Sequence, residues 1–148
     1  MAGKGFHALK LDSEQAKEIS KLFKKAGIET IKPSKLHVTI MYDESDPDIK
    51  LLPNDKTYTA KITGVERLGK KGSEWEAIAF TLKSPEIEKR HKELLNAGYD
   101  HKHDSFLCHM SVVYGPNDTD QDIIELVHKL GVLPEELTFG NEFSGKCI

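Results

Sequence analysis

Two short stretches of this 148-residue sequence share one pattern, His37-Val38-Thr39-Ile40 and His109-Met110-Ser111-Val112. Each stretch places a histidine two positions before a hydroxyl residue, within a run of residues that favour β-strands. Side chains alternate between the two faces of a strand, so the histidine and the hydroxyl of each stretch share one face. The alternation puts the intervening apolar residues on a core-facing side and predicts that Tyr42 and Tyr114 also belong to the core.

The segments before the two stretches follow the same order, a strand and then a helix. Asp12 can cap the first helix, with Gln15 in the capping-box position, and Ser84 followed by Pro85 can start the second helix. We predict strands over 6–11, 36–42, 57–68, 75–83, 108–114 and 137–147. We predict helices between Asp12 and Gly27, between Ser84 and Gly98, and over 119–130.

This order predicts an α+β fold in which one structural unit is used twice. The single domain, residues 1–148, would consist of two similar β-α-β-β lobes, approximately 1–72 and 73–148. We expect each lobe to be an antiparallel sheet with a helix on its outer face. The histidine and hydroxyl pairs of the two lobes would then face each other across a central cleft.

The composition excludes several classes of protein. Lys and Arg number 21 against 24 Asp and Glu, a net charge of −3, which argues against a coat for long nucleic acids. No apolar run is long enough to cross a bilayer, and the N-terminus lacks the apolar stretch of a secretory signal. The two cysteines, Cys108 and Cys147, do not form a disulfide framework. We therefore expect a cytoplasmic protein without a membrane partner.

Two opposed histidines have a direct use in phosphate chemistry. Imidazole titrates near neutrality, so one histidine can accept the proton of an attacking hydroxyl while the other protonates a leaving oxygen. The hydroxyls of Thr39 and Ser111 can donate hydrogen bonds to the non-bridging phosphate oxygens. We predict His37 and His109 as the catalytic pair, in a site that needs neither a metal nor a cofactor, and leave open which of them is the base.

The paired motifs on a duplicated β-α-β framework resemble those of the 2H phosphoesterase superfamily. The stretches 36–42, 83–91 and 109–114 are also similar to the phage anti-CBASS nuclease family, which cleaves the cyclic oligonucleotide messengers of a bacterial antiviral system. This resemblance implies a two-lobed fold and a metal-independent phosphodiesterase that acts on a cyclic di- or trinucleotide in the host cytoplasm. It assigns the catalytic roles to His37, Thr39, His109 and Ser111.

Three further residues are candidates for holding a nucleobase. Phe6 and Trp75 each open the first strand of a half and could stack on a base, although packing at the strand edge would explain them equally well. Glu142 in the last strand could accept a hydrogen bond from a base edge, and an exposed strand glutamate is the alternative. We expect His91, on the apolar side of its helix, to be structural.

Several alternatives stay open from the sequence alone. The enzyme could act on a 2′,3′-cyclic phosphate or on a 2′-5′ link at RNA ends, or the protein could bind a cyclic nucleotide without cutting it. His101, His103, Cys108 and His109 could be interpreted as a metal cluster, because imidazole and thiolate are good zinc ligands. Strand alternation turns Cys108 away from His109, so we expect no metal site there.

Overall fold

The computed structural model describes residues 5–45, 47, 49, 53–74, 76–102 and 106–145. Every strand and helix expected from the sequence is present in this part of the chain. The elements, in chain order, are β1 (Phe6–Leu11), α1 (Ser13–Lys25), the 3₁₀ helix η1 (Pro33–Lys35), β2 (His37–Tyr42), β3 (Tyr58–Leu68), β4 (Ala77–Lys83), α2 (Pro85–Asn96), β5 (His109–Tyr114), α3 (Asp120–Lys129) and β6 (Glu136–Gly145). No helix in the described residues has the length and apolar character required to span a membrane.

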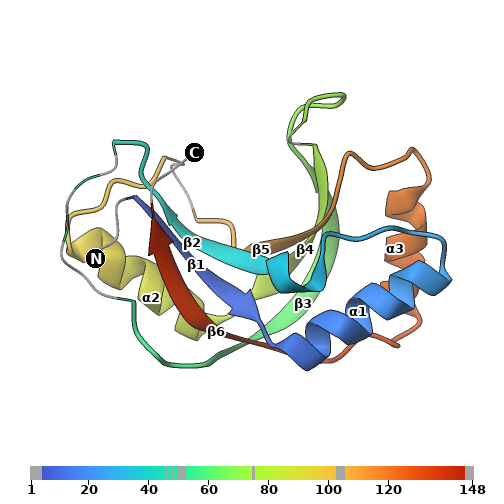
Figure 1. The fold of residues 1–148 in the computed structure, drawn as a ribbon, viewed down its shortest axis with the longest axis horizontal. Helices are drawn as coiled ribbons and strands as arrows, with labels where there is room; N and C mark the ends of the chain where they lie inside the picture. The colour runs from blue at the N-terminus through green and yellow to red at the C-terminus, as the bar shows by residue number, and fades with distance from the viewer. Residues whose placement is uncertain are drawn as a thin grey trace.

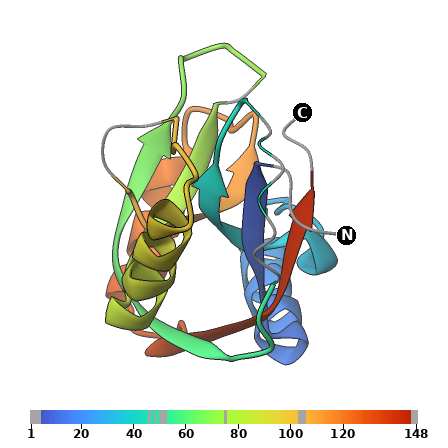
Figure 2. The same ribbon diagram turned by 90° about the vertical axis from the view of Figure 1, so that its left-hand side faces the viewer.

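The strands form one antiparallel sheet in the order β2-β1-β6-β3-β4-β5. The central strands β3 and β6 pair only from Tyr58 to Lys61, opposite Glu136 to Phe139, and diverge beyond that. The sheet therefore consists of two three-stranded groups, β2-β1-β6 and β3-β4-β5. Its two edge strands, β2 and β5, lie side by side at the middle of the molecule (Figures 1 and 2).

Each strand group is covered by a helix whose own half of the chain supplies only one of the three strands in that group. Phe23 of α1 packs against Phe80 of β4, with 6.1 Å between the ring centroids. Arg90 of α2 binds Glu142 of β6, and His91 binds the backbone of β2 at Ile40. The mixed α+β class is confirmed, but the expectation that each half packs its own helix on its own sheet is wrong.

The antiparallel pairing explains why the helices cross over. Lys10, near the end of β1, pairs with His37 at the start of β2, so α1 leaves and returns at the same end of the strand pair. The helix between two antiparallel strands does not need to cross their length, because both of its ends lie at the same end of the strand pair. It projects past their end instead and covers the neighbouring group (Figure 1).

The two histidine strands begin with a matching backbone contact. His109 follows His37 by 72 residues, and the residue before each histidine accepts an equivalent backbone hydrogen bond. The carbonyl of Leu36 accepts from the Leu11 amide at 3.1 Å, and that of Cys108 accepts from the Leu82 amide at 2.9 Å. This repeat places the two histidine motifs in matching backbone environments.

The histidine strands also carry equivalent β-bulges. His7 pairs with Met41 and Ala8 with Thr39, which leaves Ile40 as the extra residue of β2; in β5 the extra residue is Val112. A bulge shifts the alternation of side chains by one position. Met41 and Val113, which follow the bulges, are buried. Tyr42 is half-buried and Tyr114 is 48% exposed. The prediction that Tyr42 and Tyr114 belong to the core is therefore wrong.

The predicted helix starts are confirmed. The Asp12 carboxylate accepts from the amide of Gln15, and Ser84 Oγ accepts from the amide of Ile87. The reciprocal half of the expected capping box is missing, because the Gln15 side chain instead bridges to the backbone of Glu136 and Thr138. Gln15 thereby holds the start of α1 against β6, close to the junction of the two strand groups.

Candidate active site

The two motif histidines make the same hydrogen bond. The Nδ1 atom of His37 lies 2.8 Å from the carbonyl oxygen of Lys35, and Nδ1 of His109 lies 2.8 Å from that of Leu107. A carbonyl oxygen only accepts, so each Nδ1 carries a proton. The neutral ring then has a lone pair on Nε2, and the charged ring has a second proton there. Each half-buried histidine can accept or donate a proton at that atom.

Each motif hydroxyl lies above a small residue of the neighbouring strand. Thr39 and Ser111 are half-buried, whereas Val38 and Met110 are completely buried, which confirms the predicted alternation at this point. Cross-strand partners share a face of the sheet, and those partners are Ala8 for Thr39 and Ala79 for Ser111. Both alanines are completely buried, so each hydroxyl lies beside a small, covered residue.

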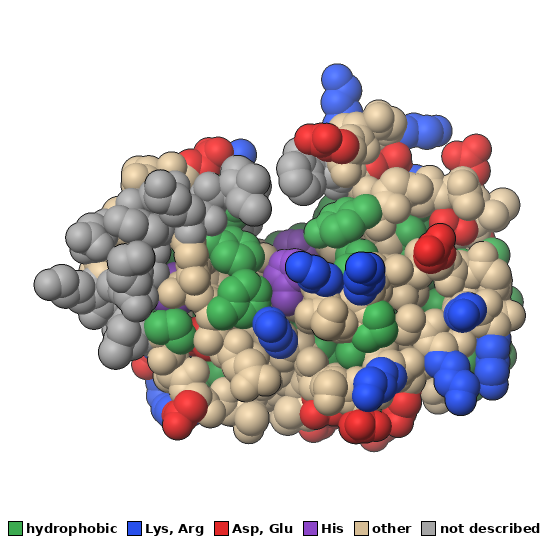
Figure 3. All heavy atoms as spheres, viewed as in Figure 1, with side chains coloured by type: hydrophobic (Ala, Val, Ile, Leu, Met, Phe, Trp, Pro, Cys, Tyr) green, Lys and Arg blue, Asp and Glu red, His purple; other side chains and the backbone are tan. Residues whose placement is uncertain are grey.

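The two motifs lie on strands that contact each other. β2 and β5 are next to one another, although they are the opposite edges of the sheet. Figure 3 shows histidine side chains on the floor of a hollow in this face, with hydrophobic side chains on both sides and Lys or Arg side chains next to them. The structure therefore brings the motif strands of both halves to one hollowed region of the surface.

Aromatic rings line the side of the site that contains His37. The ring of Phe6 makes edge contacts with His37 and with Tyr42, both at 6.3 Å between centroids, and lies 5.8 Å from Phe143. All four side chains are half-buried. The structure thus places Phe6 beside His37, and its stacking on a base stays a prediction. Trp75, the second stacking candidate, lies outside the described residues.

Tyr42 and Phe143 also belong to this group of aromatic rings, and neither was expected there from the sequence. Tyr42 was hidden by the bulge, since strict alternation assigns it to the core. Phe143 follows Glu142 in β6 and pairs with Ala8, so it shares a face with the motif hydroxyl. The alternation of β6 could have revealed Phe143 if the pairing of β6 with β1 had been known.

Glu142 is inside the protein, and this corrects the expectation of an exposed strand glutamate. Its side chain is 0% exposed and accepts from Arg90 Nε and Nη2, both at 2.8 Å, while His7 Nδ1 lies 3.3 Å away. Burial opposes ionisation, but the hydrogen bonds from His7 and Arg90 outweigh it and lower the pKa of Glu142. In this structure both carboxylate oxygens are engaged by the protein, so a base edge would have to compete for them.

His91 has the structural role expected of it. Its Nδ1 atom lies 2.6 Å from the carbonyl oxygen of Ile40, the bulge residue of β2, and its ring stacks on Phe106 at 4.2 Å. These contacts fix α2 beneath the first histidine strand.

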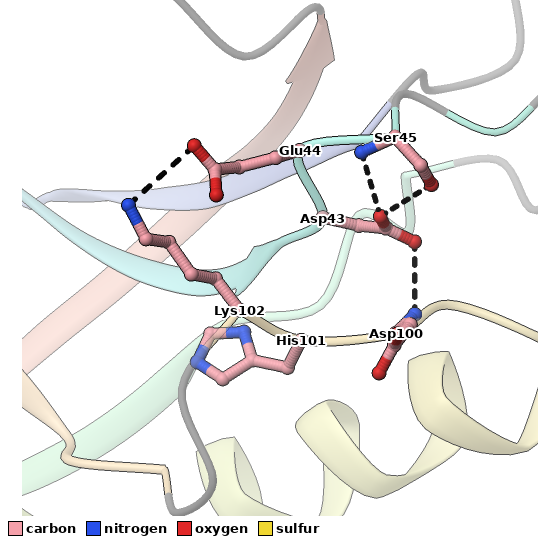
Figure 4. Close-up of a pocket in the computed structure, with 6 residues that line it drawn as sticks. All are labelled: Asp43, Glu44, Ser45, Asp100, His101 and Lys102. Atoms are coloured by element: carbon pink, nitrogen blue, oxygen red, sulfur yellow. Dashed lines mark hydrogen bonds and ion pairs between the residues drawn. The ribbon is translucent and has the colours of Figure 1, made fainter.

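A polar pocket lies at the end of β2 (Figure 4), lined by Asp43, Glu44, Ser45, Asp100, His101 and Lys102. Asp43 accepts from the amide and hydroxyl of Ser45 and from the amide of Asp100. The neighbouring loop pairs with Tyr42, whose amide donates to His101 Nδ1 and whose carbonyl accepts from the Lys102 amide. This pocket therefore secures the loop that follows α2 to the end of the histidine strand.

The alternative metal cluster gains no support within the described residues. No group of three or more His, Cys, Asp or Glu side chains is placed there to hold a metal ion, and His103 lies outside those residues. Cys108 is buried on the core face, and burial raises the pKa of its thiol to about 12. Such a thiol resists the deprotonation that metal binding requires.

The fold and site define a mixed α+β protein whose two histidine-hydroxyl motifs lie on edge strands that contact each other. A family model described as anti-CBASS protein Acb1 matches residues 5–139 of the chain. The chain therefore belongs to the Acb1 anti-CBASS family, whose name associates it with phage evasion of CBASS. A search of curated proteins finds no match.

Proposed function

We propose that this protein is a metal-independent phosphodiesterase of the 2H type that cleaves 3′,5′ bonds of cyclic oligonucleotide messengers. The observation that supports the proposal most strongly is the matched pair of Nδ1 hydrogen bonds, which gives both histidines the same tautomer. Family membership supports the substrate class, because CBASS immunity is the process that the family name says it opposes. The protein would act in the cytoplasm of the infected host.

In the proposed reaction, Nε2 of one histidine takes the proton of the ribose 2′-OH next to the scissile phosphate. The 2′ oxygen attacks phosphorus, and the bond to the 5′ oxygen breaks as the other histidine donates its Nε2 proton to that oxygen. Thr39 and Ser111 donate hydrogen bonds to the non-bridging oxygens, where negative charge increases. The products are a 2′,3′-cyclic phosphate and a free 5′-hydroxyl. Water can open the cyclic phosphate when the histidines exchange roles.

The test uses purified protein and a substrate panel analysed by mass spectrometry. The panel contains cyclic di- and trinucleotides, a 2′,3′-cyclic mononucleotide and a 2′-5′-linked RNA, each with and without EDTA. We expect linear products from at least one cyclic oligonucleotide in both conditions. His37→Ala and His109→Ala should each abolish cleavage. His128→Ala, which removes a half-buried histidine of α3, is the matched control and should leave cleavage unchanged.

Other outcomes would redirect the proposal. Binding of a cyclic oligonucleotide without turnover would identify a sequestering protein. Cleavage restricted to the 2′,3′-cyclic mononucleotide or to the 2′-5′ link would identify an enzyme of RNA ends. Loss of activity in EDTA that zinc restores would replace the two-histidine mechanism with a metal-dependent one.

A further inference from the structure

Lys10 occupies the position directly across from His37. In the pairing of β1 with β2, Lys10 is opposite His37, Ala8 is opposite Thr39 and Phe6 is opposite Tyr42. Cross-strand partners share a face, so Lys10 projects from the same side of the sheet as the motif. It is exposed, whereas its neighbours Leu9 and Leu11 are buried in the core.

The lysine ammonium lies over an aromatic ring of the neighbouring strand β6. Lys10 Nζ lies 5.5 Å from the centroid of the Phe143 ring. Phe143 and Thr39 are both cross-strand partners of Ala8, one on each side of it. The ammonium therefore lies on the β6 side of Ala8, whereas the Thr39 hydroxyl lies on the β2 side, so the exposed lysine side chain must rotate across β1 to meet a phosphate at Thr39.

The second half of the molecule has no cation at the matching place. Thr81 is opposite His109, so it occupies the position that Lys10 has opposite His37. Glu66 is opposite Ala79, so it occupies the position that Phe143 has opposite Ala8. Glu66 is exposed. The two sides of a duplicated site thus differ in charge, with a lysine beside His37 and a glutamate on the side of His109. A phosphate between them would be attracted to the first side and repelled by the second.

We propose that Lys10 is a further catalytic residue, whose ammonium binds a non-bridging oxygen of the scissile phosphate next to Thr39. This inference rests on the proposed function. Attack by the 2′ oxygen adds negative charge to the non-bridging oxygens, and a cation aimed at them stabilises the transition state more than the substrate. Lys10 keeps its proton throughout, and no bond to it forms or breaks. In the proposed metal-independent site, this residue supplies a positive charge.

The test compares Lys10→Met and Lys10→Arg with the wild type on the cyclic oligonucleotide that the panel identifies. We expect Lys10→Met to lower kcat about 100-fold, in line with the loss of one charge-stabilising donor, and to change KM much less. Lys10→Arg should keep most of the activity, because it retains the positive charge. Lys24→Met removes an equal charge from the exposed surface of α1 and should match the wild type.

Circular dichroism and the unfolding midpoint of each variant report whether the fold is intact, and Lys10→Gln provides a second neutral variant. The inference is overturned if the neutral variants cleave within about three-fold of the wild type, less than general acid-base or charge stabilisation would give. It is also overturned if Lys10→Arg is as impaired as Lys10→Met, which would indicate packing instead of charge. Absence of cleavage by the wild type would overturn the proposed function itself, so the two failures are distinguishable.

Discussion

A hydrogen bond from Nδ1 to a backbone carbonyl leaves each motif histidine with one nitrogen free to exchange a proton with a ligand. Because the bond is the same at His37 and His109, this bond does not distinguish either ring as base or acid. The difference between them comes from neighbours on the adjacent strands, Lys10 on one side and Thr81 on the other. The order of proton transfers therefore depends on how the substrate lies against those neighbours.

The two histidines should act as one catalytic unit. His37→Ala and His109→Ala should each lower kcat by at least about 100-fold, since each removes one proton transfer. The double variant should cost little more than either single variant, because the mechanism fails once one transfer is lost. Steady-state kinetics on the cleaved cyclic oligonucleotide measures this. If either single variant keeps more than about a tenth of wild-type turnover, that histidine does not transfer a proton in the rate-limiting step.

Cys108 should be chemically inert in the folded protein. Burial raises the pKa of its thiol to about 12, so the reactive thiolate is scarce at neutral pH. In a Cys147→Ser variant, which leaves Cys108 as the single thiol, we expect no alkylation by iodoacetamide at pH 7.5 until denaturant is added. Labelling measured by intact mass checks this. Rapid labelling of the native variant would contradict the buried position and reopen the possibility of a metal ligand.

At the scale of elements, the positions of helices and strands were predictable, because they depend on residues that are close in the sequence. The capping residues Asp12 and Ser84 and the β-forming runs set the positions of helices and strands, and all of these were found. The bulges at Ile40 and Val112 were not predictable, because they depend on how β2 and β5 pair with their neighbours. Each bulge moved a tyrosine from the expected core to the face of the histidines.

Long-range partners explain the remaining differences. The pattern of an alternating strand predicts an exposed glutamate, but Glu142 forms an ion pair with Arg90 of α2, a residue 52 positions earlier in the chain. That ion pair depends on α2 crossing to the first strand group, which no local pattern encodes. The half-buried positions of the motif histidines and hydroxyls were predictable, because the His-x-hydroxyl spacing lies within a single strand and occurs twice.

The buried ion pair at the junction of α2 and β6 should contribute to stability. Glu142→Gln leaves Arg90 buried without its carboxylate, and removing one partner of such a pair costs about 3 kcal/mol or more. Urea unfolding at pH 7 measures this loss. If Glu142 instead served mainly as a base contact, the variant would keep its stability and bind the cyclic oligonucleotide more weakly.

The same pair predicts a pH dependence. The folded pKa of Glu142 is lowered, so its contribution is fully present above the unfolded carboxyl value of about 4.3. It is lost as pH falls below that value and through the folded pKa. The free energy of unfolding should therefore fall more steeply with acid in the wild type than in Glu142→Gln. Equal slopes in the two proteins would show that Glu142 titrates alike in the folded and unfolded chains.

On the scale of the whole molecule, the site exists only because the sheet bends. β2 and β5 are the outermost strands of six, and the divergence of β3 from β6 brings them together. Neither three-stranded group contains both histidines, and each group includes one strand from the other half of the chain. A fragment of residues 1–72 would therefore lose α2 and β6 from the first group and would leave α1 with only β3 of the group that it covers.

A site assembled in this way provides two proton-transfer groups, and the proposed mechanism uses the hydroxyls of Thr39 and Ser111 to bind phosphate oxygens and not to attack phosphorus. The closest hydroxyl to the phosphorus is then the 2′-OH of the substrate, and intramolecular attack of this kind can gain roughly 7–11 kcal/mol from proximity. A 2′-deoxy or 2′-O-methyl group at the scissile sugar should block cleavage and still allow binding. Wild-type turnover of the ribonucleotide should produce a transient 2′,3′-cyclic phosphate, visible by phosphorus NMR before a linear 3′-phosphate accumulates.

The matched control for that measurement is a cyclic trinucleotide with the 2′-deoxy group at a single sugar. Cleavage should stop at that sugar and continue at the other two, so one molecule reports both the block and the intact enzyme. Isothermal titration with the fully deoxy analogue checks that the site still binds. If the deoxy position is cut at a rate near that of its ribose neighbours, water attacks phosphorus directly. One of the histidines would then activate water instead of the sugar, and the 2′,3′-cyclic intermediate would be absent.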